Sequence, residues 1–560
     1  MTGKPASDDT GVLIAGAGPV GLALAIELAR RDIPLRIVDR SAGPAAESRA
    51  LGTQARTIEH LRMMGIGEDR LVPSLRAREM VVHDGARVIA RVRLRVERPD
   101  ATYHGLLVMS QADTERMLLA RLGDLGIAVG RGVSLTGFSQ DDHGVIGTLS
   151  GPDGARTVRA QFLAGCDGAR SAVRHHLRED FAGFTYPQRF LLGDCRIAGD
   201  RPRDQGNAWL HPDGLLFALP LPGDGLWRVI IADRTAGDDA APPAFDELAG
   251  VARERSRGTL TPSDPVWLSR FTVNCRMAGA YRFGRVFLAG DAAHVHSPVG
   301  GQGMNTGIQD AVNLGWKLAL AVRGRASDPL LDTYAAERMP VARAVLRGSD
   351  RGFRAMMPAN PALRWLRDRA IGLAASAPAF GAAVSERISE LGIDYRNSPL
   401  TGPPARAGFG ARAPRPGDRA PQASFEPAIA GEPATLFDVY GLGGFTLLLF
   451  PDPANPSASL QQAATIGGWV RDRLGDDCRP LLVVPGPPRG VPGAIPAAFD
   501  TAGEIRRVVG ATGEAAVLVR PDGYLAARAA SLDQAAIWRA LAAAFAPGLL
   551  PGLPDGGPRA

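Results

Sequence analysis

Two glycine-dense turns carry the residue types and spacings best suited to hold a cofactor. The first, Gly16-Ala17-Gly18-Pro19-Val20-Gly21, lies between an apolar run at 12–15 and a helix expected over 21–31. Its first glycine permits a tight turn, the second lets the backbone approach a pyrophosphate, and the third lets helix and strand pack closely. The helix N-terminus adds unpaired N–H groups and a partial positive charge. This turn predicts a dinucleotide site, but by itself it does not separate NAD from FAD.

An acidic residue stands where the ribose of such a dinucleotide would lie. Asp39 closes a second expected strand, 35–38. It follows the turn by about twenty residues, the spacing at which a carboxylate accepts hydrogen bonds from ribose hydroxyls. Arg40 comes next and is included in the candidate site. Strand, helix and strand together predict the start of a βαβ unit.

A second glycine-dense segment lies far downstream. It runs from Gly290-Asp291 to Met304-Asn305, between an apolar strand expected at 286–289 and a helix expected over 305–322. Asp291 can accept hydrogen bonds from ribityl hydroxyls, and backbone N–H groups near Met304 can stabilise negative charge on the pyrimidine edge of a flavin. The candidate contacts are Gly290, Asp291, Pro298, Gly301, Gly303, Met304 and Asn305. Two such turns predict the opposite ends of one long cofactor, FAD.

Two further features leave alternatives open. Asp167-Gly168-Ala169-Arg170-Ser171 ends a strand expected at 161–164 and begins a helix. It is either an ordinary helix cap with a tight turn or a turn that organises the flavin and pyridine-nucleotide region. His294 and His296 have no third ligand nearby in the sequence, so ordinary hydrogen-bonded histidines are favoured over a metal site.

The surrounding elements show both helical and strand patterns. Residues 75–98 and 181–275 alternate as strands do and predict a mostly antiparallel sheet inserted between pieces of the first domain. A mainly helical run continues to about residue 391, and residues 396–433, rich in Pro, Gly, Ala and Arg, predict a linker that wraps the surface. Further helices are expected at 57–64 and 111–122. A compact α/β domain follows, with strands expected at 445–450, 480–484 and 516–520 and helices at 459–474 and 532–544.

Composition indicates a globular protein in a reducing compartment. The 560 residues carry a net charge of +6, and arginine supplies 62 of the 64 basic residues (64 − 2 lysines). These residues are scattered, which argues against nucleic acid as a partner. The four cysteines lie far apart and form no CxxC, so neither a disulfide framework nor a zinc site is predicted. With no transmembrane run, and with Asp8 and Asp9 arguing against a signal peptide, a bacterial cytoplasmic protein without a membrane partner is expected.

In this order and spacing the motifs resemble those of the class A flavoprotein monooxygenases, the aromatic hydroxylases typified by p-hydroxybenzoate hydroxylase. The chain is similar to the larger members that act on phenols and aromatic polyketides and carry an extra C-terminal domain. The similarity covers essentially the whole chain after the first few residues. Supporting motifs are Glu47-Ser48-Arg49-Ala50-Leu51-Gly52 with Arg56-Thr57, Gln111 before Asp113-Thr114-Glu115, and Val519-Arg520-Pro521-Asp522-Gly523-Tyr524.

The resemblance implies further site residues. In that family an arginine matching Arg49 touches FAD, a glutamine matching Gln111 contacts the ribityl–phosphate region, and a proline matching Pro298 lines the flavin ring. Family members often have glutamate where this chain has Asp39, and the shorter side chain keeps the carboxylate. The C-terminal region resembles a thioredoxin-like domain without CxxC, which implies a structural or dimerisation role rather than redox activity.

The fold so implied is α/β. It combines a Rossmann-like FAD-binding domain (10–74, 99–180 and 276–395), an inserted, mostly antiparallel substrate-binding sheet domain (75–98 and 181–275) and a helical connection. A linker (396–433), a C-terminal thioredoxin-like α/β domain (434–547) and a tail (548–560) complete it.

The implied activity is hydroxylation of an aromatic small molecule, phenolic or of the polyketide and quinone type. NADPH or NADH reduces FAD, O₂ forms a C4a-hydroperoxyflavin, and the protein positions the ring and excludes water. No second dinucleotide fold is present, so the nicotinamide is expected to bind transiently while the flavin swings. Baeyer–Villiger oxidation or antibiotic inactivation by the same peroxide, and a non-catalytic FAD module, remain open, as does a homodimer. No catalytic base is assigned, and ordinary sheet roles are favoured for Trp209, His211, Phe217 and Arg228.

Overall fold

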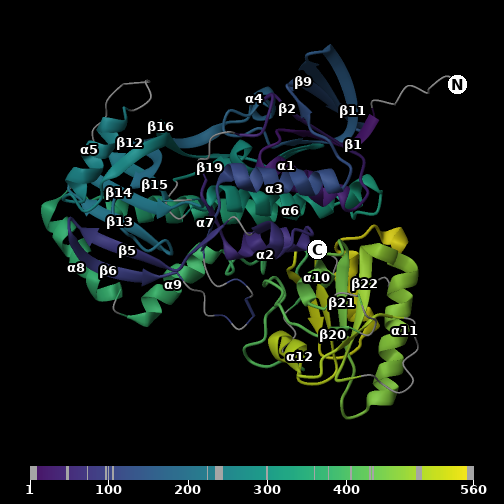
Figure 1. Cartoon of the computed structure of the whole chain (residues 1–560). Helices are drawn as coiled ribbons and strands as arrows, with labels where there is room; N and C mark the ends of the chain where they lie inside the picture. The colour runs from purple at the N-terminus through teal and green to yellow at the C-terminus, as the bar shows by residue number, and fades with distance from the viewer. Residues whose placement is uncertain are drawn as a thin grey trace.

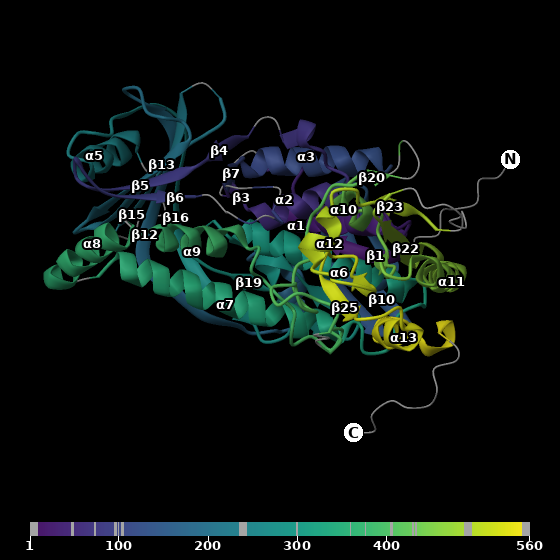
Figure 2. The same ribbon diagram turned by 90° about the horizontal axis from the view of Figure 1, so that it is seen from below.

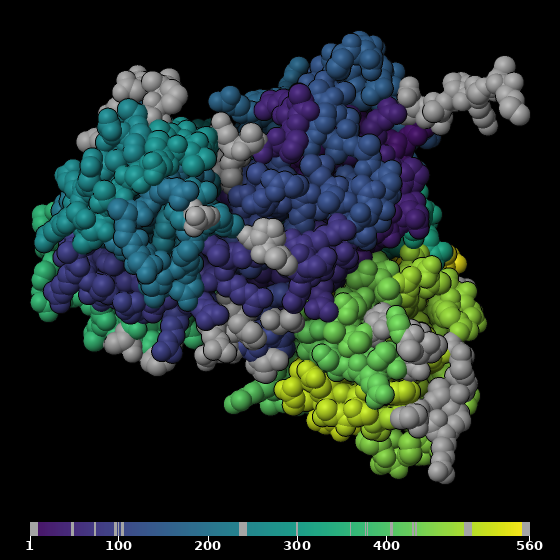
Figure 3. All heavy atoms as spheres, viewed as in Figure 1, coloured from purple at the N-terminus to yellow at the C-terminus, as the bar shows by residue number. Residues whose placement is uncertain are grey.

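The structure is a computed structural model. It describes residues 9–45, 50–71, 74–94, 98, 100–101, 103, 106–223, 225–233, 244–297, 301–358, 360–375, 377–403, 407–427, 431, 434–486 and 495–550. Figure 1 shows a central α/β region, a sheet region beside it and a C-terminal α/β region. In the space-filling view of Figure 3 the C-terminal region, green to yellow, lies directly against the central one.

An eight-stranded sheet forms the central region, with the order β17-β18-β11-β1-β2-β8 and with β10 and β9 continuing from β11. Its strands are β1 (Asp9–Ala15), β2 (Leu35–Asp39), β8 (Gly130–Arg131), β9 (Ser134–Asp141), β10 (Gly144–Gly151), β11 (Gly154–Gly165), β17 (Arg282–Phe283) and β18 (Val286–Leu288). β1 pairs in parallel with β2 and with β11, and β11 with β18. Val12, Leu13 and Ile14 are fully buried, because a central parallel strand is covered on both faces. The strands expected at 12–15, 35–38 and 161–164 are confirmed.

Helices cover this sheet. α1 (Pro19–Ala29) contacts both α3 (Gln111–Asp124) and α6 (Gly303–Val322), and Figure 1 shows the three together. α1 lacks a polar face because it is enclosed by these neighbours. Together with α2 (Ala55–Met63), these helices end within two residues of their predicted bounds.

The second sheet has the order β19-β16-β12-β15-β14-β13-β5-β6. Its strands are β5 (Glu79–Asp84), β6 (Arg87–Arg93), β12 (Phe181–Ile197), β13 (Gln205–His211), β14 (Gly214–Pro220), β15 (Leu226–Asp233), β16 (Pro262–Ala278) and β19 (His294–Val295). Neighbouring strands are antiparallel except β13 and β5, which run parallel. The prediction of a mostly antiparallel sheet is therefore confirmed.

Helices pack on both faces of the second sheet. α5 (Phe245–Arg255) covers one face, where Val229 and Leu248 share a buried cluster. α7 (Asp332–Met356), α8 (Pro361–Ala375) and α9 (Pro378–Ser389) lie on the other side, as Figure 2 shows, and there Phe190 packs with Phe353. Side chains alternate along β15, so Arg228 points away from α5, toward the face that we call the inward face.

The C-terminal region is a sheet with the order β20-β23-β22-β21-β24-β25. Its elements are β20 (Glu426–Pro427), β21 (Phe445–Phe450), β22 (Cys478–Val484), β23 (Ala497–Phe499), β24 (Ala515–Val519), β25 (Leu525–Ala529), α10 (Leu436–Tyr440), α11 (Pro456–Leu474), α12 (Glu504–Val509) and α13 (Gln534–Ala542). Leu447 and Leu449 of β21 pack with Trp538 of α13, whereas Leu448 and its face pack with Ile505 of α12. A strand buried on both faces explains the continuous apolar run of β21.

The segment predicted to wrap the surface is partly interior. Ala420 and Ala423 are buried in the C-terminal core. Arg419 is buried too, and its guanidinium binds Glu59 of α2 and Asp100. The expectation of a surface position is wrong for these residues, because ion pairing, which composition does not show, draws the segment inward.

Within the described ranges, no helix is both long and apolar enough to cross a bilayer. All four cysteines are buried and unbonded.

Candidate active site

Segments far apart in the sequence meet at one edge of the central sheet. Ala15 lies beside Gly165 and Val38 in the parallel register, and Gly165 lies beside Leu288. The carboxyl ends of β1, β2, β11 and β18 therefore share an edge. Cofactors bind at this edge in open α/β sheets. Gly16 directly follows β1, Asp39 is the last residue of β2, and Asp167 and Asp291 follow the ends of β11 and β18 by two and three residues.

The first glycine turn is packed where the motif requires close approach and open where a ligand would lie. A Cβ at Gly16, whose φ is 101°, would lie 2.3 Å from the carbonyl oxygen of Cys166. A Cβ at Gly21 would lie 1.9 Å from the oxygen of Gly16, whereas one at Gly18 would meet nothing within 4 Å. α1 begins at Pro19 without a side-chain cap, so its first N–H groups face this open space.

Asp39 fastens this turn to the next strand. Its carboxylate accepts hydrogen bonds from the backbone N–H of Ala17 (2.7 Å) and of Ser41 (2.8 Å). Carboxylate oxygens can each accept more than one hydrogen bond, so ribose hydroxyls remain within its capacity. The neighbouring Arg40 is exposed.

The two glycine turns touch each other. A Cβ at Gly290 would lie 2.7 Å from Cγ2 of Val20, and one at Gly307 would lie 2.6 Å from the same methyl. Gly290 also has a φ of 61°, which favours glycine. α1, α6 and the turn after β18 can approach this closely only because both contact positions are glycines. Val20 therefore packs between the two turns rather than facing open space.

α6 begins with unpaired backbone donors. Its first intrahelical hydrogen bond runs from Thr306 N to Gln302 O (2.8 Å), which leaves the N–H groups of Gly303, Met304 and Asn305 without a partner inside the helix. The side chain of Asn305 is fully buried and serves another purpose.

That side chain fastens α6 to the strand β3 (Gly52–Thr53). Asn305 Nδ2 donates to the carbonyls of Gly52 and Gly301, both at 2.8 Å, and its Oδ1 accepts from Gln54 N at 2.8 Å. The positive φ of Gly301, 62°, turns the chain into this clamp. Asn305 thus fixes the helix start through its amide, which leaves only its backbone N–H for a cofactor.

The other predicted contacts fall into three groups. Asp291 is exposed beside the second turn. Gln111, at the start of α3, donates through Nε2 to Glu115 (2.9 Å) and through its backbone to Ala50 O (3.2 Å). Arg49 and Pro298 lie outside the described residues.

The Asp167 turn precedes the short helix α4 (Ala172–His176), and a role beside the flavin stays a prediction. Ser171, not Asp167, is the N-cap of α4, with its Oγ accepting from Arg174 N. Asp167 Oδ2 accepts from the N–H of Ala172 (2.7 Å) and of Val173, whereas its buried Oδ1 has no hydrogen-bond partner among the described residues. The turn is an ordinary cap with one acceptor unused, at the edge where the strands end.

A buried charge network that the sequence did not single out supports the second turn. Asp310 of α6 accepts hydrogen bonds from Gly290 N (3.1 Å), His294 Nε2 (2.8 Å) and Arg338 Nε (2.6 Å). Burial raises the pKa of Asp310, but the charges of Arg338 and His294 outweigh it and hold that pKa below its usual value. His294 thus makes an ordinary hydrogen bond. Burial lowers the pKa of neighbouring His296 to about 4, which keeps it neutral.

Glu390 packs against the first turns of α6 and has an unusual backbone conformation and a raised pKa. It is buried, and its φ of 59° places a non-glycine residue in the left-handed region. Its carboxyl contacts Thr306 Oγ1 (3.4 Å) and Gln309 Nε2. Burial raises the pKa of Glu390 to about 8. The group is therefore a neutral acid at pH 7.

The inward face of the second sheet carries one buried ion pair. Arg228 makes a two-pronged contact with Asp194 (2.8 and 2.7 Å) and is 1% exposed, and its Nη1 has no hydrogen-bond partner among the residues that the structure describes. Its cross-strand neighbour Leu219 packs in an apolar cluster with Leu51, which precedes the Gly52 held by Asn305. This cluster joins the inward face to the cofactor edge.

The other sheet candidates have separate locations. Trp209 is buried on the α5 side, where it stacks on His83 at 4.7 Å. Phe217 packs with the cluster of Phe190 on the inward face. Trp209 and Phe217 thus pack with neighbouring sheet residues, and the favoured ordinary sheet role for all four candidates stays a prediction.

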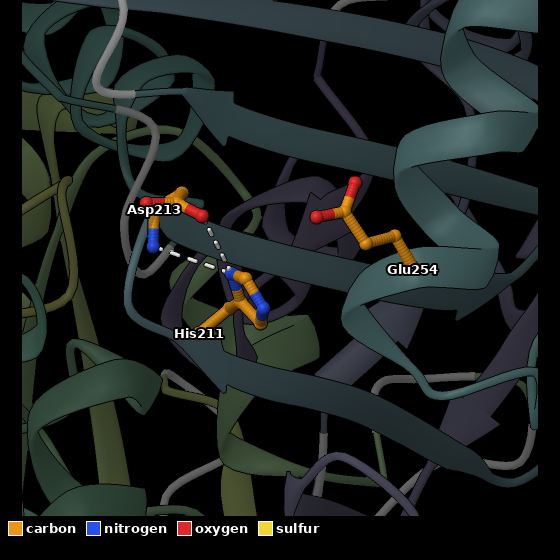
Figure 4. A group of neighbouring side chains, drawn as sticks. All are labelled: His211, Asp213 and Glu254. Atoms are coloured by element: carbon orange, nitrogen blue, oxygen red, sulfur yellow. Dashed lines mark hydrogen bonds and ion pairs between the residues drawn. The ribbon is translucent and has the colours of Figure 1, made fainter.

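His211 lies at the tip of the β13–β14 hairpin, near Asp213 and Glu254, as Figure 4 shows. These three side chains are close enough to surround a cation. However, Asp213 N donates to His211 Nδ1 (3.2 Å), and Arg255 lies close enough to lower the pKa of His211 alongside burial. We assign no metal site there, since the histidine lone pair is engaged and a cation already adjoins it.

The geometry fits an FAD molecule. Open space lies beside Gly18, unpaired N–H groups start α1 and α6, and carboxylates end β2 and follow β18. The pyrophosphate needs open space and helix N–H groups, the ribose and the ribityl chain need carboxylate acceptors, and the flavin ring needs N–H groups at its pyrimidine edge. Contact between the two turns brings both ends of the site onto one edge.

Comparison with known proteins agrees. Residues 9–349 match the family model described as FAD binding domain, more than half of the chain. The 6-methylpretetramide 4-monooxygenase of Streptomyces rimosus is 35% identical over 531 residues, which cover 94% of this chain and 91% of that protein. The structure of CabE, an aromatic hydroxylase from angucycline biosynthesis, is 31% identical with a TM-score of 0.71 and coverages of 93% and 96%. A complex of aklavinone-11 hydroxylase with FAD and aklavinone is 26% identical, with a TM-score of 0.74 and coverages of 97% and 100%.

Proposed function

The chain belongs to the FAD-dependent aromatic monooxygenases that share this FAD binding domain, and on that premise we propose that it hydroxylates a multi-ring phenolic or quinoid substrate with NAD(P)H and O₂. The observation that carries the proposal is the contact of Val20 with Gly290, which joins the two glycine turns into one site beside an apolar sheet face.

We propose that the first turn holds the adenosine half of FAD. The N–H groups that start α1, beside Gly18, bind the pyrophosphate, and Asp39 binds the ribose. Arg40, Gln111 and Asp167 adjoin the same edge and remain candidate contacts. Support comes from the open space at Gly18 and from the position of Asp39 at the end of β2.

The second turn holds the flavin half in this proposal. Asp291 accepts from the ribityl hydroxyls, and the free N–H groups of Gly303 and Met304 face the pyrimidine edge of the ring. When bound, FAD supplies the two-electron reduction and the activation of O₂. The chain contributes a helix N-terminus that stabilises negative charge on the ring, and the Asn305 clamp keeps that helix start in place. Arg49 and Pro298 stay predictions, as does the nicotinamide groove.

Arg228 is the proposed anchor for the substrate. A buried guanidinium with an N–H that no described residue accepts is costly unless a further acceptor pairs with it. An ionisable phenol or a quinone carbonyl supplies that acceptor. Because Nη1 is not exposed to solvent, a substrate reaches it only when side chains around it change rotamer, a common adjustment on binding. An aromatic molecule with an acidic hydroxyl is therefore the expected substrate class.

The test begins with the purified protein, which is expected to be yellow. NADPH and NADH consumption is then followed with simple phenols, naphthoquinones and multi-ring polyketides, and product mass and connectivity are determined. A product with one added hydroxyl on the ring supports the proposal. A lactone or ester product would replace hydroxylation with oxygen insertion into a carbon–carbon bond. Bound FAD without any substrate-stimulated oxidation of either nucleotide would refute the monooxygenase assignment for this chain.

Arg228→Met tests the anchor. Loss of one hydrogen bond to a charged group corresponds to about 1.5–3 kcal/mol, so substrate affinity should fall by about ten- to a hundredfold. Arg91→Gln, which breaks the exposed Arg91–Glu79 pair on β6 of the same sheet, is the matched control and should leave substrate affinity unchanged. Equal substrate affinities in the two variants would exclude Arg228 as the anchor.

A further inference from the structure

One face of α6 is polar although it is completely buried. Thr306, Asp310, Asn313 and Lys317 follow one another at spacings of four, three and four residues, which places them on one side of the helix. Each is at most 1% exposed. Buried polar groups need partners, and here two adjacent residues of α7 provide them.

The half of this stripe nearest the cofactor edge is bound by Arg338. Its Nε donates to Asp310 (2.6 Å), its Nη2 to the carbonyl of Thr306 (3.0 Å) and its Nη1 to Tyr395 Oη (2.9 Å). Asp310 in turn accepts from the backbone N–H of Gly290. The second glycine turn is therefore held through α6 by a residue of α7.

The other half is bound by Glu337, the preceding residue of α7. Glu337 accepts hydrogen bonds from Lys317 Nζ (2.7 Å) and Asn313 Nδ2 (2.6 Å). Its oxygens also accept from Nη1 (2.6 Å) and Nη2 (2.8 Å) of Arg520, which lies in the C-terminal region just after β24. The C-terminal region thus reaches the residue next to Arg338.

A second side chain of that turn completes the contact. Asp522 accepts from Asn313 Nδ2 and from Trp316 Nε1, both at 3.2 Å, and binds the guanidinium of Arg520. The ring of Tyr524 packs on Tyr395, the partner of Arg338, with centroids 4.3 Å apart. The turn from Arg520 to Tyr524 therefore binds Glu337 directly and contacts Arg338 through Tyr395.

We propose that Arg520 and Asp522 are positioning residues through which the C-terminal domain fixes α6 relative to α7. This arrangement holds the Gly290 turn in the conformation that binds flavin. Breaking a buried ion pair leaves a charge without compensation, so the helices must shift or admit water. Because Glu337 and Arg338 are adjacent on one rigid helix, displacement of the first moves the second. The inference rests on the proposed function only in taking the Gly290 turn as part of the flavin site.

The test compares Asp522→Asn and Arg520→Lys with the control Asp438→Asn. Asp438 pairs with Arg62 across the same domain boundary, but this pair is partly exposed and lies outside the network. Deuterium uptake of the segment 286–297 is measured with and without FAD, together with the FAD dissociation constant. We expect exchange near Gly290 to quicken at least tenfold in both network variants and their FAD dissociation constants to rise by a similar factor. The control should match the wild type in both.

If Asp522→Asn and Arg520→Lys lower only the melting temperature, with exchange near Gly290 and FAD affinity equal to those of the control, the domain merely docks and the proposal is wrong. Tyr395→Phe provides a milder variant should those chains fold poorly. It removes the hydroxyl partner of Arg338 and keeps the ring. Unchanged exchange in that variant would also count against the proposal. None of these readouts needs a substrate, so failure of the hydroxylase assignment would be seen separately.

Discussion

Replacing Glu390 by glutamine should remove a specific pH dependence of stability. The carboxyl is 3% exposed, follows α9 in a left-handed conformation, and contacts Thr306 and Gln309 at the start of α6. Glutamine keeps the shape and the hydrogen-bonding capacity but does not titrate. Only the proton equilibrium of the side chain is changed.

The size of the effect follows from the raised pKa. Burial moves the pKa of Glu390 from 4.5 to about 8, so between these values the folded state binds more protons than the unfolded state. Stability from this group is therefore complete below pH 4.5 and is lost as the pH rises toward 8. The loss is about 2–3 kcal/mol between pH 5 and 7 and about 5 kcal/mol in total, as orders of magnitude.

Urea unfolding of the wild type and of Glu390→Gln at pH 5, 6, 7 and 8 measures this directly. The difference between the two free energies of unfolding should shift by about 2–3 kcal/mol from pH 5 to pH 7, in favour of the variant. Glu386→Gln, at a partly exposed glutamate of the same helix, is the control and should show no such shift. A difference that stays constant over the whole pH range would show that Glu390 is ionised in the folded chain and would refute the reasoning.

Two other substitutions test the cofactor edge. Gly290→Ala would place a Cβ 2.7 Å from Val20 Cγ2 at a φ of 61°, so FAD content after purification should fall severalfold, whereas Gly250→Ala, in an open helical position, should not change it. Full FAD occupancy in Gly290→Ala would mean that the two turns need not touch. Asn305→Ala removes the hydrogen bonds to the carbonyls of Gly52 and Gly301 and from the N–H of Gln54, at a cost of about 1–3 kcal/mol for each group that neither water nor another partner then satisfies. Weaker FAD binding and a lower unfolding midpoint are expected, and unchanged values of both would contradict the clamp.

The bounds of helices and strands could be predicted from the sequence wherever the local apolar pattern agrees with the packing in the core. The apolar run Phe445–Phe450 is a strand with those bounds, and α1, α3 and α6 end within two residues of prediction, because their apolar periodicity also directs them into the core. The meeting of the two glycine turns was predicted because each lies between an apolar strand and a helix, and its physical cause is that the carboxyl ends of the parallel strands share an edge. Family resemblance supplied Arg49 and Pro298, which stay predictions.

What the sequence did not reveal depends on partners far along the chain. Asp310, Glu337 and Arg338 look like surface residues in isolation, because helices with mixed charges are usually solvated. The spacing of Thr306, Asp310, Asn313 and Lys317 within an apolar helix was the available signal, since a polar face there requires buried partners. Arg419 was likewise placed on the surface by composition, although Glu59 and Asp100 draw it inside.

The strand order also constrains how the chain folds during synthesis. β1 ends at Ala15 and leaves the ribosome long before its partner β11, which begins at Gly154, and before the next strand, β18, which begins at Val286. At the usual bacterial pace of translation, β1 waits on the order of ten seconds for β11, with one edge of a highly apolar strand unpaired. Nascent chains of this protein should therefore depend on chaperones until well past residue 290, and abrupt overexpression should yield aggregates rather than truncated folded intermediates.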